Sequence, residues 1–201
     1  IAGEVGQEKL VDQAEKFGFG SRPMSDLPSS ASRVTSDPDA QLEPPQLAQT
    51  GIGQFEVAAT PLQMAMVAGT VANDGVLMKP HLVRKVRAPN LSVLEQHEPE
   101  EVGRAMSVAD ARELNDLMVS VVANGTGRPA AIPGVKVGGK TGTAESSPDR
   151  PPYAWYIGFA PAKDPQVAVA VLVESAANTS DIAGGRLGGP IARSVMEAVL
   201  R

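Results

Sequence analysis

The clearest pattern in the sequence is the return of an apolar residue every three or four positions between residues 107 and 124. The apolar positions are Val108, Ala111, Leu114, Leu117, Met118, Val121 and Val122. Ser107 is a favourable N-cap residue, Asp110 suits the positively polarised end of a helix, and Gly125 favours an end after Asn124. This spacing therefore predicts an amphipathic helix with one face toward a core.

A second helix is expected within residues 55–72, which contain a single charge, Glu56, and are otherwise rich in Val, Ala, Leu and Met. Thr60 followed by Pro61 is a typical helix start, because proline in the first turn sacrifices no intrahelical hydrogen bond. Asn-Asp-Gly at 73–75 would close it with residues that tolerate left-handed geometry. A helix without a polar face should be buried on most of its sides.

Two more helices are expected near the ends of the sequence. Residues 4–17 alternate apolar and charged positions at helical spacing, and Gly18 would stop that helix. Gly-Gly-Pro at 188–190 is expected to open a final helix that continues to Leu200, since proline is favoured in a first turn.

Short apolar segments between these helices predict strands. Residues 76–86 form one, broken by Pro80, and residues 91–94 are its expected partner. Three further candidates follow, at 136–145, 153–159 and 167–173. The last is almost wholly Val, Ala and Leu, which indicates a central strand covered on both faces. Their connections are too short for crossover helices, so we expect an α/β fold of the layered α+β kind, an antiparallel sheet flanked by helices.

Residues 21–50 carry five prolines and six serines and show little apolar periodicity. Two interpretations fit this composition: an extended connector that wraps the surface of one domain, and a disordered linker between two domains. Neither includes regular secondary structure. The total length of 201 residues is that of one domain or most of one, and both interpretations stay open on composition alone.

The composition argues against several functions. A net charge of −5 without a basic stripe excludes nucleic acid as an expected partner. The chain has no cysteine, so it contains no disulfide and no thiolate nucleophile. Its only histidines, His81 and His97, are too far apart in sequence for a zinc site, and neither a metal nor a cofactor is expected. No apolar run approaches the length of a membrane span.

The segment richest in chemistry is Gly-Gly-Lys-Thr-Gly-Thr-Ala-Glu at 138–145. Lys140 supplies a positive charge among small neighbours, and Thr141 and Thr143 would project from the same face of a strand. A cation and two hydroxyls can hold a carboxylate, while glycines such as Gly142 let an extended substrate approach the backbone. A surface turn carrying one lysine is the alternative interpretation of an isolated motif of this kind.

Two neighbouring segments give weaker signals. Ser-Ser-Pro-Asp at 146–149, flanked by Glu145 and Arg150, forms a loop that could overhang a site at Lys140, although such loops are more often plain surface. The glycine-rich stretch 184–189 lacks the Gly-Lys-Ser/Thr ending of a phosphate-binding loop, so no phosphate site is expected there.

Around the Lys-Thr-Gly-Thr motif, segments from about residue 50 onward resemble, in order and spacing, the transpeptidase domain of class B penicillin-binding proteins. These segments are Gly53-Gln54, 57–65, 73–75, 78–83, 125–130, 134–139 and 155–161. Residues 3–20 are similar to the helix that follows the second motif of this family. The resemblance covers about three quarters of the chain, and it places the protein in the penicillin-binding protein and serine β-lactamase superfamily.

This resemblance implies an activity and a set of site residues. The family's serine attacks the bond between two terminal D-alanines of a peptidoglycan stem peptide, and an amine from a neighbouring stem then takes the acyl group. Lys140, Thr141 and Thr143 would hold the terminal carboxylate, and the N–H of Thr143 would be one donor of the oxyanion hole. Gly142 would let the substrate add to the strand edge. β-Lactam antibiotics would bind the same site.

One departure from the family pattern concerns the nucleophile. No lysine of the chain has a serine three residues before it, and no asparagine has a serine two residues before it, so the family's Ser-x-x-Lys and Ser-x-Asn motifs are both missing. In family order both precede Ile1. We therefore expect residues 1–201 to be the C-terminal portion of a single transpeptidase domain, with an extended connector at 21–50, and to be inactive alone.

The resemblance also implies a location and partners for the intact parent protein. It would lie on the extracytoplasmic face of the bacterial membrane, held by a helix upstream of this chain. Its partners would be stem peptides ending in D-Ala-D-Ala, β-lactams, the upstream half of the same protein and other cell-wall synthesis proteins. Two alternatives remain: a non-catalytic module of a cell-wall complex, and a serine β-lactamase relative, which residues 60–65 and the long connector disfavour.

Overall fold

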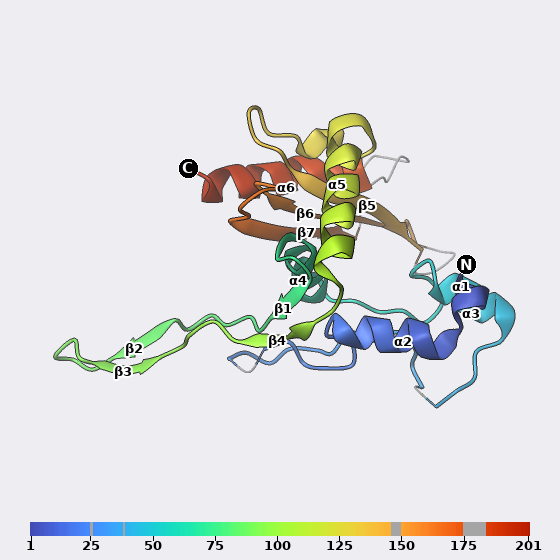
Figure 1. Ribbon diagram of the computed structural model, residues 1–201, viewed down its shortest axis with the longest axis horizontal. Helices are drawn as coiled ribbons and strands as arrows, with labels where there is room; N and C mark the ends of the chain where they lie inside the picture. Colours follow the sequence, from blue (N-terminus) through green and yellow to red (C-terminus); the bar gives the residue numbers. More distant parts are fainter. Residues whose placement is uncertain (25, 38, 146–149, 175–183) are drawn as a thin grey trace.

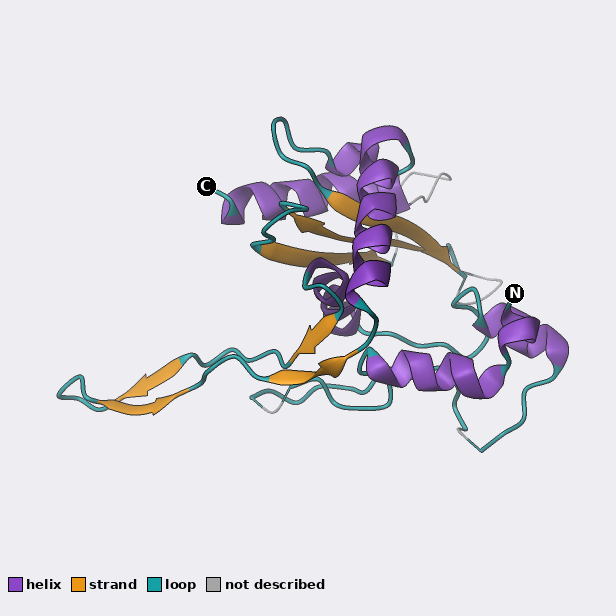
Figure 2. Ribbon diagram, viewed as in Figure 1, coloured by secondary structure: helices purple, strands orange, loops and turns teal. Residues whose placement is uncertain are grey.

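The computed structural model of the protein describes residues 1–24, 26–37, 39–145, 150–174 and 184–201. Its helices are α1 (Ala2–Val5), α2 (Gln7–Lys16), α3 (Pro44–Thr50), α4 (Pro61–Ala72), α5 (Val108–Asn124), a 3₁₀ turn η1 (Arg128–Ala130) and α6 (Gly184–Val199). Its strands are β1 (Val76–Met78), β2 (Lys85–Arg87), β3 (Val93–Gln96), β4 (Glu101–Arg104), β5 (Gly138–Ala144), β6 (Tyr153–Ala160) and β7 (Val167–Val173). Figures 1 and 2 show their arrangement.

The centre of the molecule is an antiparallel sheet with the strand order β5-β6-β7. Helix α6 covers one face of this sheet, and α4 and α5 cover the other (Figure 1). A separate cluster of buried residues lies on each face, with Tyr156 and Met196 on the α6 side and Phe159 and Met118 on the α4–α5 side. The expected fold, an antiparallel sheet flanked by helices, is confirmed.

The prediction that residues 167–173 form the central strand is wrong, because β7 lies at the end of the described sheet and β6 lies in the middle. The other half of that prediction holds. Helix α4 packs on one face of β7 and α6 packs on the other. The sequence of β7 is almost continuously apolar because helices cover both of its faces. A terminal strand can be covered on both faces as well as a central one.

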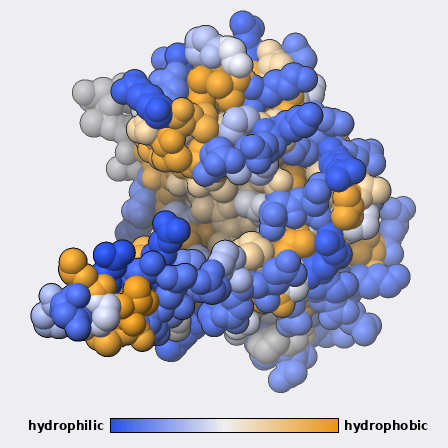
Figure 3. Space-filling view, turned by 60° about the vertical axis from the view of Figure 1, so that its left-hand side comes forward, coloured by the Kyte–Doolittle hydropathy of each residue, from blue (hydrophilic) through white to orange (hydrophobic). Residues whose placement is uncertain are grey.

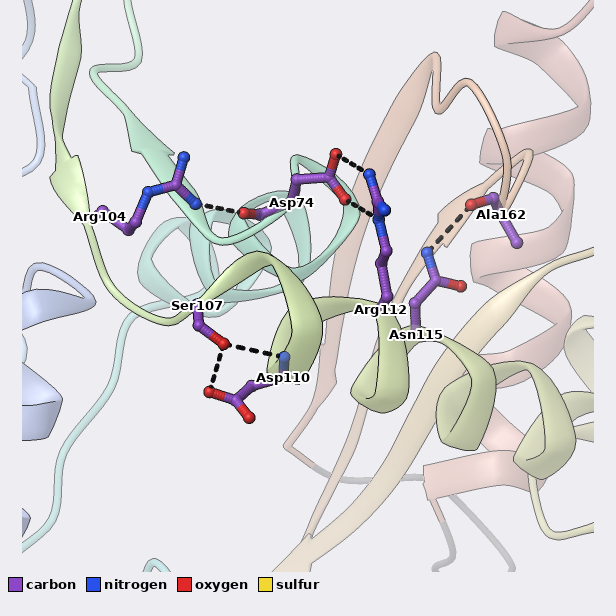
Figure 4. Close-up of polar contacts among 7 residues, drawn as sticks. All are labelled: Asp74, Arg104, Ser107, Asp110, Arg112, Asn115 and Ala162. Atoms are coloured by element: carbon purple, nitrogen blue, oxygen red, sulfur yellow. Dashed lines mark hydrogen bonds and ion pairs between the residues drawn. The ribbon is translucent and has the colours of Figure 1, made fainter.

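Helix α5 has the expected start and end. The hydroxyl of Ser107 accepts a hydrogen bond from the N–H of Asp110 (3.1 Å), and the helix ends at Asn124. Its N-terminal half is tied to a neighbouring turn, since the Arg112 guanidinium donates to both carboxylate oxygens of Asp74, at 3.0 and 3.2 Å (Figure 4).

Two more contacts extend this network. Arg104, at the end of β4, donates to the Asp74 carbonyl at 2.6 Å, and Asn115 of α5 donates to the Ala162 carbonyl between β6 and β7 at 3.0 Å (Figure 4). The first half of α5 is thus fixed both to the end of α4 and to the sheet.

Helix α4 begins as expected, with the Thr60 hydroxyl accepting from the N–H of Gln63. The expectation of burial on most sides is only partly met: Gln63, Ala68, Thr70 and Val71 are buried, and most of the other residues are half-buried. A hollow of about 590 Å³ runs along this helix, between it, β1 and β7. Figure 3 shows hydrophobic residues around a hollow of the surface above a projecting arm.

That arm is the hairpin β2–β3, and it corrects the prediction of one strand over residues 76–86. The segment contains two strands, β1 and β2, in two different sheets (Figure 2). Strand β1 pairs with β4, which the sequence did not predict, while the expected partner of β2 near residues 91–94 is found as β3. All residues of β2, β3 and β4 are exposed, so no burial periodicity marks them.

The remaining corrections concern boundaries. The N-terminal helix is divided at Gly6, whose φ of 85° lies in the left-handed region, into α1 and α2. The connector at residues 21–50 contains α3, so the expectation of no regular structure there is wrong. Glu43 and Gln46 form a reciprocal capping box at the start of α3, and prolines occupy its first turn.

Candidate active site

Strand β5 carries the Lys-Thr-Gly-Thr motif at the terminal position of the described sheet. It pairs with β6 in unbroken antiparallel register, with Lys140 opposite Ile157 and Thr143 opposite Ala154. The expectation that residues 136–145 form a strand antiparallel to residues 153–159 is confirmed, with slightly different bounds. The edge of β5 that faces away from β6 bears the motif.

The motif side chains divide between the two faces of the sheet. Lys140 is opposite Ile157, which packs on the α4–α5 side, whereas Thr141 is opposite Tyr156, which packs on the α6 side. Thr143 shares the face of Thr141 because strand side chains alternate. The Lys140 side chain is exposed and lies along its own strand. Its Nζ donates a hydrogen bond to the carbonyl of the next residue, Thr141, at 2.6 Å.

The glycines that precede the lysine have a role in packing that the sequence did not indicate. Gly138 and Gly139 are buried. A Cβ on Gly138 would meet the Phe159 ring at 2.4 Å, and a Cβ on Gly139 would lie 2.0 Å from the Tyr156 hydroxyl. These two glycines therefore leave room for two aromatic rings of β6, while the expectation that the glycines of the motif admit an extended substrate at the strand edge stays a prediction.

Helix α6 begins directly behind the motif. It starts at Gly184 rather than at residues 188–190, so Pro190 lies inside the helix. A Cβ on Gly184 would lie 2.0 Å from the Trp155 carbonyl oxygen and 2.5 Å from that of Gly142. The glycine-rich stretch 184–189 lets the helix backbone touch the sheet.

Thr126 is a site residue that sequence reasoning did not identify. It lies in the turn after α5, and its Oγ1 is 2.8 Å from Oγ1 of Thr141. A Cβ on Gly185 would lie 2.1 Å from the Thr126 carbonyl oxygen and 3.1 Å from Cγ2 of Thr141. The available signal was the Gly-Thr-Gly sequence at 125–127, which was noted for its family resemblance but given no role.

The aromatic residue beneath the motif is fully buried, and burial raises the pKa of the Tyr156 hydroxyl well above its ordinary value of 10. That hydroxyl has no hydrogen-bond partner among the described residues. Tyr156 therefore stays neutral at physiological pH and serves to fill space beside Gly139 rather than to exchange protons.

The histidines lie closer together than their separation in sequence suggested. The rings of His81 and His97 are stacked with centroids 5.8 Å apart at the base of the β2–β3 arm, so two residues separated in sequence are neighbours in space. Within the part of the chain that the structure describes, no three His, Cys, Asp or Glu side chains gather as metal ligands. No helix among the described residues is both long and apolar enough to span a bilayer.

Two hollows of the surface lie away from the motif. One, of about 710 Å³, is bordered by Asp74 and Arg112 together with parts of α5 and the β6–β7 connection, and the other runs along α4. Neither includes Lys140, so a groove beside this lysine stays a prediction. The loop at 146–149, considered as a cover of the site, lies outside the described residues.

Comparison with known proteins decides the family. The model of the penicillin binding protein transpeptidase domain matches residues 1–197. The chain belongs to this family. This transpeptidase domain sequence is 43% identical over 200 residues to the peptidoglycan D,D-transpeptidase PbpA of Mycolicibacterium smegmatis. The match covers 98% of this chain and 40% of that protein. It is 32% identical over 198 residues to the stage V sporulation protein D of Bacillus subtilis, covering 96% of this chain and 30% of that protein.

Solved structures of penicillin-binding proteins agree with the fold. The ceftriaxone acyl-enzyme complex of penicillin-binding protein A from M. tuberculosis superimposes with a TM-score of 0.88 at 40% identity, covering 100% of this chain and 45% of that one. Penicillin-binding protein 3 from M. tuberculosis in complex with aztreonam gives a TM-score of 0.84 at 29% identity, covering 99% and 47%. The chain thus spans less than half the length of these relatives.

Proposed function

We propose that this chain is the C-terminal portion of a peptidoglycan D,D-transpeptidase domain and supplies its carboxylate-binding strand. The observation that carries the proposal is the position of the Lys-Thr-Gly-Thr motif on β5, at the terminal position of the described sheet. Family membership and a relative named as a D,D-transpeptidase support it. In this proposal the serine nucleophile comes from a Ser-x-x-Lys segment upstream of Ile1, because the chain contains no such motif.

The substrate would add to β5 as a further strand. Successive residues of a strand direct their backbone N–H and C=O to alternate sides. The Thr141 carbonyl accepts the Lys140 ammonium, from which we infer that Thr141 points its backbone groups to the edge away from β6. Thr143, two residues further along, then points its N–H to the same edge. Such an edge is suited to β-augmentation by an extended stem peptide.

The side chains of this edge suit a terminal carboxylate. The hydroxyls of Thr141 and Thr143 would donate to it from one face, and the Lys140 ammonium, which reaches the edge at the Thr141 carbonyl, would donate from the other. Charge-assisted hydrogen bonds such as that of the ammonium are the stronger ones. The ammonium and an incoming peptide N–H compete for the Thr141 carbonyl. When the carboxylate draws the ammonium away, that carbonyl is released for the substrate backbone, so the two recognition events assist each other.

The chemistry that follows is acyl transfer. The serine oxygen attacks the carbonyl of the penultimate D-alanine, and the Thr143 N–H stabilises the resulting oxyanion, an effect worth about 3 kcal/mol in comparable sites. The C–N bond then breaks and the terminal D-alanine leaves as a protonated amine. The acyl-enzyme is finally attacked by an amine of a neighbouring stem peptide, which restores the serine and forms the cross-link.

The same proposal assigns the protein a place and partners. The intact parent would act at the extracytoplasmic face of the membrane, anchored by an upstream helix, beside other cell-wall synthesis proteins. β-Lactams, such as the ceftriaxone bound to the M. tuberculosis relative, would acylate the upstream serine while their carboxylate lies on β5. The chain by itself would be inactive.

Labelled penicillin tests the proposal. The chain expressed together with the residues encoded before Ile1 should become covalently labelled, and residues 1–201 alone should not. The label should then persist for many times longer than the acylation takes, because a transpeptidase releases β-lactams slowly. Absence of labelling in the longer protein would favour the non-catalytic module. Rapid release of hydrolysed penicillin would favour a β-lactamase, and labelling of residues 1–201 alone would contradict the upstream nucleophile.

A further inference from the structure

The hydroxyl of Thr126 touches the candidate site from outside the Lys-Thr-Gly-Thr strand. Thr126 lies in the turn between α5 and η1, and its Oγ1 is 2.8 Å from Oγ1 of Thr141. A separation of 2.8 Å is typical of a hydroxyl–hydroxyl hydrogen bond. Thr141 therefore has a protein partner for one of its hydrogen-bonding positions, on the face of β5 that α6 covers.

Thr126 is held in place by the backbone on both sides of it. The N–H groups of Gly125 and Gly127 both donate to the carbonyl of Val121 in the last turn of α5, at 3.0 and 3.1 Å. Helix α6 passes close enough that a Cβ on Gly185 would lie 2.1 Å from the Thr126 carbonyl oxygen. The turn is thus clamped between the end of α5 and the start of α6.

The opposite end of α5 is fixed as well. Arg112 is bonded to Asp74 at the end of α4, and Asn115 is bonded to the Ala162 carbonyl between β6 and β7 (Figure 4). Because α5 is held at both ends, Thr126 cannot follow small movements of β5 without disturbing these contacts. The backbone of Thr126 is consequently fixed, and its hydroxyl contacts Thr141 from a constant position.

We propose that Thr126 is a positioning residue that fixes the direction in which Thr141 donates its hydroxyl proton. In this arrangement the Thr126 hydroxyl donates to Oγ1 of Thr141, which leaves the Thr141 proton free for the carboxylate of a stem peptide or a β-lactam. A hydroxyl has one proton and two acceptor positions, so receiving one bond restricts where its own proton can point. The inference rests on the proposed function, in which Thr141 binds that carboxylate.

The opposite direction of the same hydrogen bond has the opposite consequence. If Thr141 donates to Thr126, the Thr141 proton is withheld from a carboxylate, and removal of the Thr126 hydroxyl would strengthen carboxylate binding. The two arrangements are therefore distinguished by the sign of one measurement. The exposed position of Thr126 makes its substitution compatible with folding.

The experiment compares Thr126→Val, which keeps the shape but lacks the hydroxyl, with Thr126→Ser, which keeps the hydroxyl. Both are made in the protein extended upstream of Ile1, and acylation rates are measured with benzylpenicillin and with its methyl ester. The valine variant should acylate about threefold to tenfold more slowly with the acid, the range of one hydrogen bond, and at an unchanged rate with the ester. The serine variant should restore the rate with the acid.

A double-mutant cycle with Thr141→Val sharpens the test. Once Thr141 lacks its hydroxyl, Thr126→Val should have no further effect on the rate with the acid, because the two substitutions remove one shared contact. An unchanged or faster rate with the acid in Thr126→Val, or an equal loss with acid and ester, would overturn the positioning role. Melting temperatures identify any loss that comes from unfolding.

Lys140→Ala separates failure of this inference from failure of the proposed function. If Lys140→Ala leaves the preference for the acid over the ester unchanged, β5 is not the carboxylate site and the proposed function fails with it. If Lys140→Ala reduces that preference while Thr126→Val does not, only the role of Thr126 is refuted.

Discussion

Lys140 is a residue whose charge can be removed with little effect on the fold. Its side chain is exposed, and its Nζ bonds only to the neighbouring Thr141 carbonyl among the described residues. Gly138 and Gly139, by contrast, are enclosed by the rings of Phe159 and Tyr156. Within one strand, therefore, two residues serve packing and the next is available for a ligand.

This contrast predicts the behaviour of Lys140→Ala in the upstream-extended protein. Acylation by benzylpenicillin should slow by about tenfold to hundredfold, the range of a charge-assisted hydrogen bond, while the free energy of unfolding changes by less than about 0.5 kcal/mol. Thr143→Val is the matched comparison and should slow acylation less, because its backbone N–H survives. Stopped-flow acylation and thermal unfolding measure both quantities, and an unchanged rate for Lys140→Ala would contradict its role.

The site could be predicted from the sequence only where its residues are contiguous. Lys140, Thr141 and Thr143 were proposed because they lie within one four-residue motif with a recognisable spacing. Thr126 was not identified, because its bond to Thr141 joins two segments that only the meeting of α5, α6 and β5 brings together. The packing role of Gly138 and Gly139 depends in the same way on the rings of another strand.

At the scale of elements, α6 is stabilised by its docking rather than by its own sequence. Glycine costs about 1 kcal/mol relative to alanine in a helix interior, and the first turns of α6 contain several. These glycines are Gly184, Gly185, Gly188 and Gly189, and all are buried. The helix forms because their missing side chains allow its backbone to lie directly on β5, β6 and the turn after α5.

Gly185→Ala tests this explanation. The new Cβ would lie 2.1 Å from the Thr126 carbonyl oxygen, so helix and turn must separate, and we expect a loss of about 1–3 kcal/mol in stability together with slower acylation. Gly69→Ala in α4 is the control, since its Cβ would meet only Ala168 at 3.7 Å and should be neutral or stabilising. Equal melting temperatures for Gly185→Ala and wild type would refute the close contact.

The bond between α5 and the end of α4 predicts a dependence on pH. The hydrogen bond from Arg112 lowers the pKa of Asp74 below its ordinary value of 3.8. A carboxyl group whose pKa is lowered by folding contributes stability above its unfolded pKa and loses that contribution as the pH falls through the folded pKa. The contribution should therefore be complete at neutral pH and decline below about pH 4.

Asp74→Asn measures this contribution. The melting temperature of the variant should fall below that of wild type by a small, constant amount between pH 5 and 7, and the two values should converge as the pH is lowered below about 4. The amount is small because both side chains are exposed. A difference that persists unchanged at about pH 2.5 would show that Asp74 acts through something other than its charge.

The sequence predicted the elements that are buried and missed elements that are exposed or rich in proline. Helix α5 was predicted correctly because its apolar periodicity and its capping residues agree, and α4 because a long apolar segment follows a typical Thr-Pro helix start. Strand β4 was missed because its residues, Glu-Val-Gly-Arg, are all exposed and show no apolar alternation. Helix α3 was missed because prolines suggested a connector, although two of them occupy a first turn where proline is well tolerated.

At the scale of the whole molecule, the arm β2–β3 and the apolar hollow along α4 leave much hydrophobic surface uncovered. Leu91 and Leu94 of the arm, and Leu82 just before it, are each more than 60% exposed. The sequence indicated that α4 needs partners on several sides, and the structure leaves part of it facing the hollow. We propose that the upstream segment that bears the nucleophile covers this part of α4.

The contact between α6 and β5 also sets an order of events during synthesis. The motif strand leaves the ribosome before β6, β7 and the helix that backs it. At about 5–20 residues per second, the 56 residues between Thr143 and the end of α6 take several seconds to emerge. Throughout that interval Thr126 and Thr141 lack helix α6, which packs against both of them at Gly185. A nascent chain therefore completes the packing around the edge of β5 only after α6 has been made.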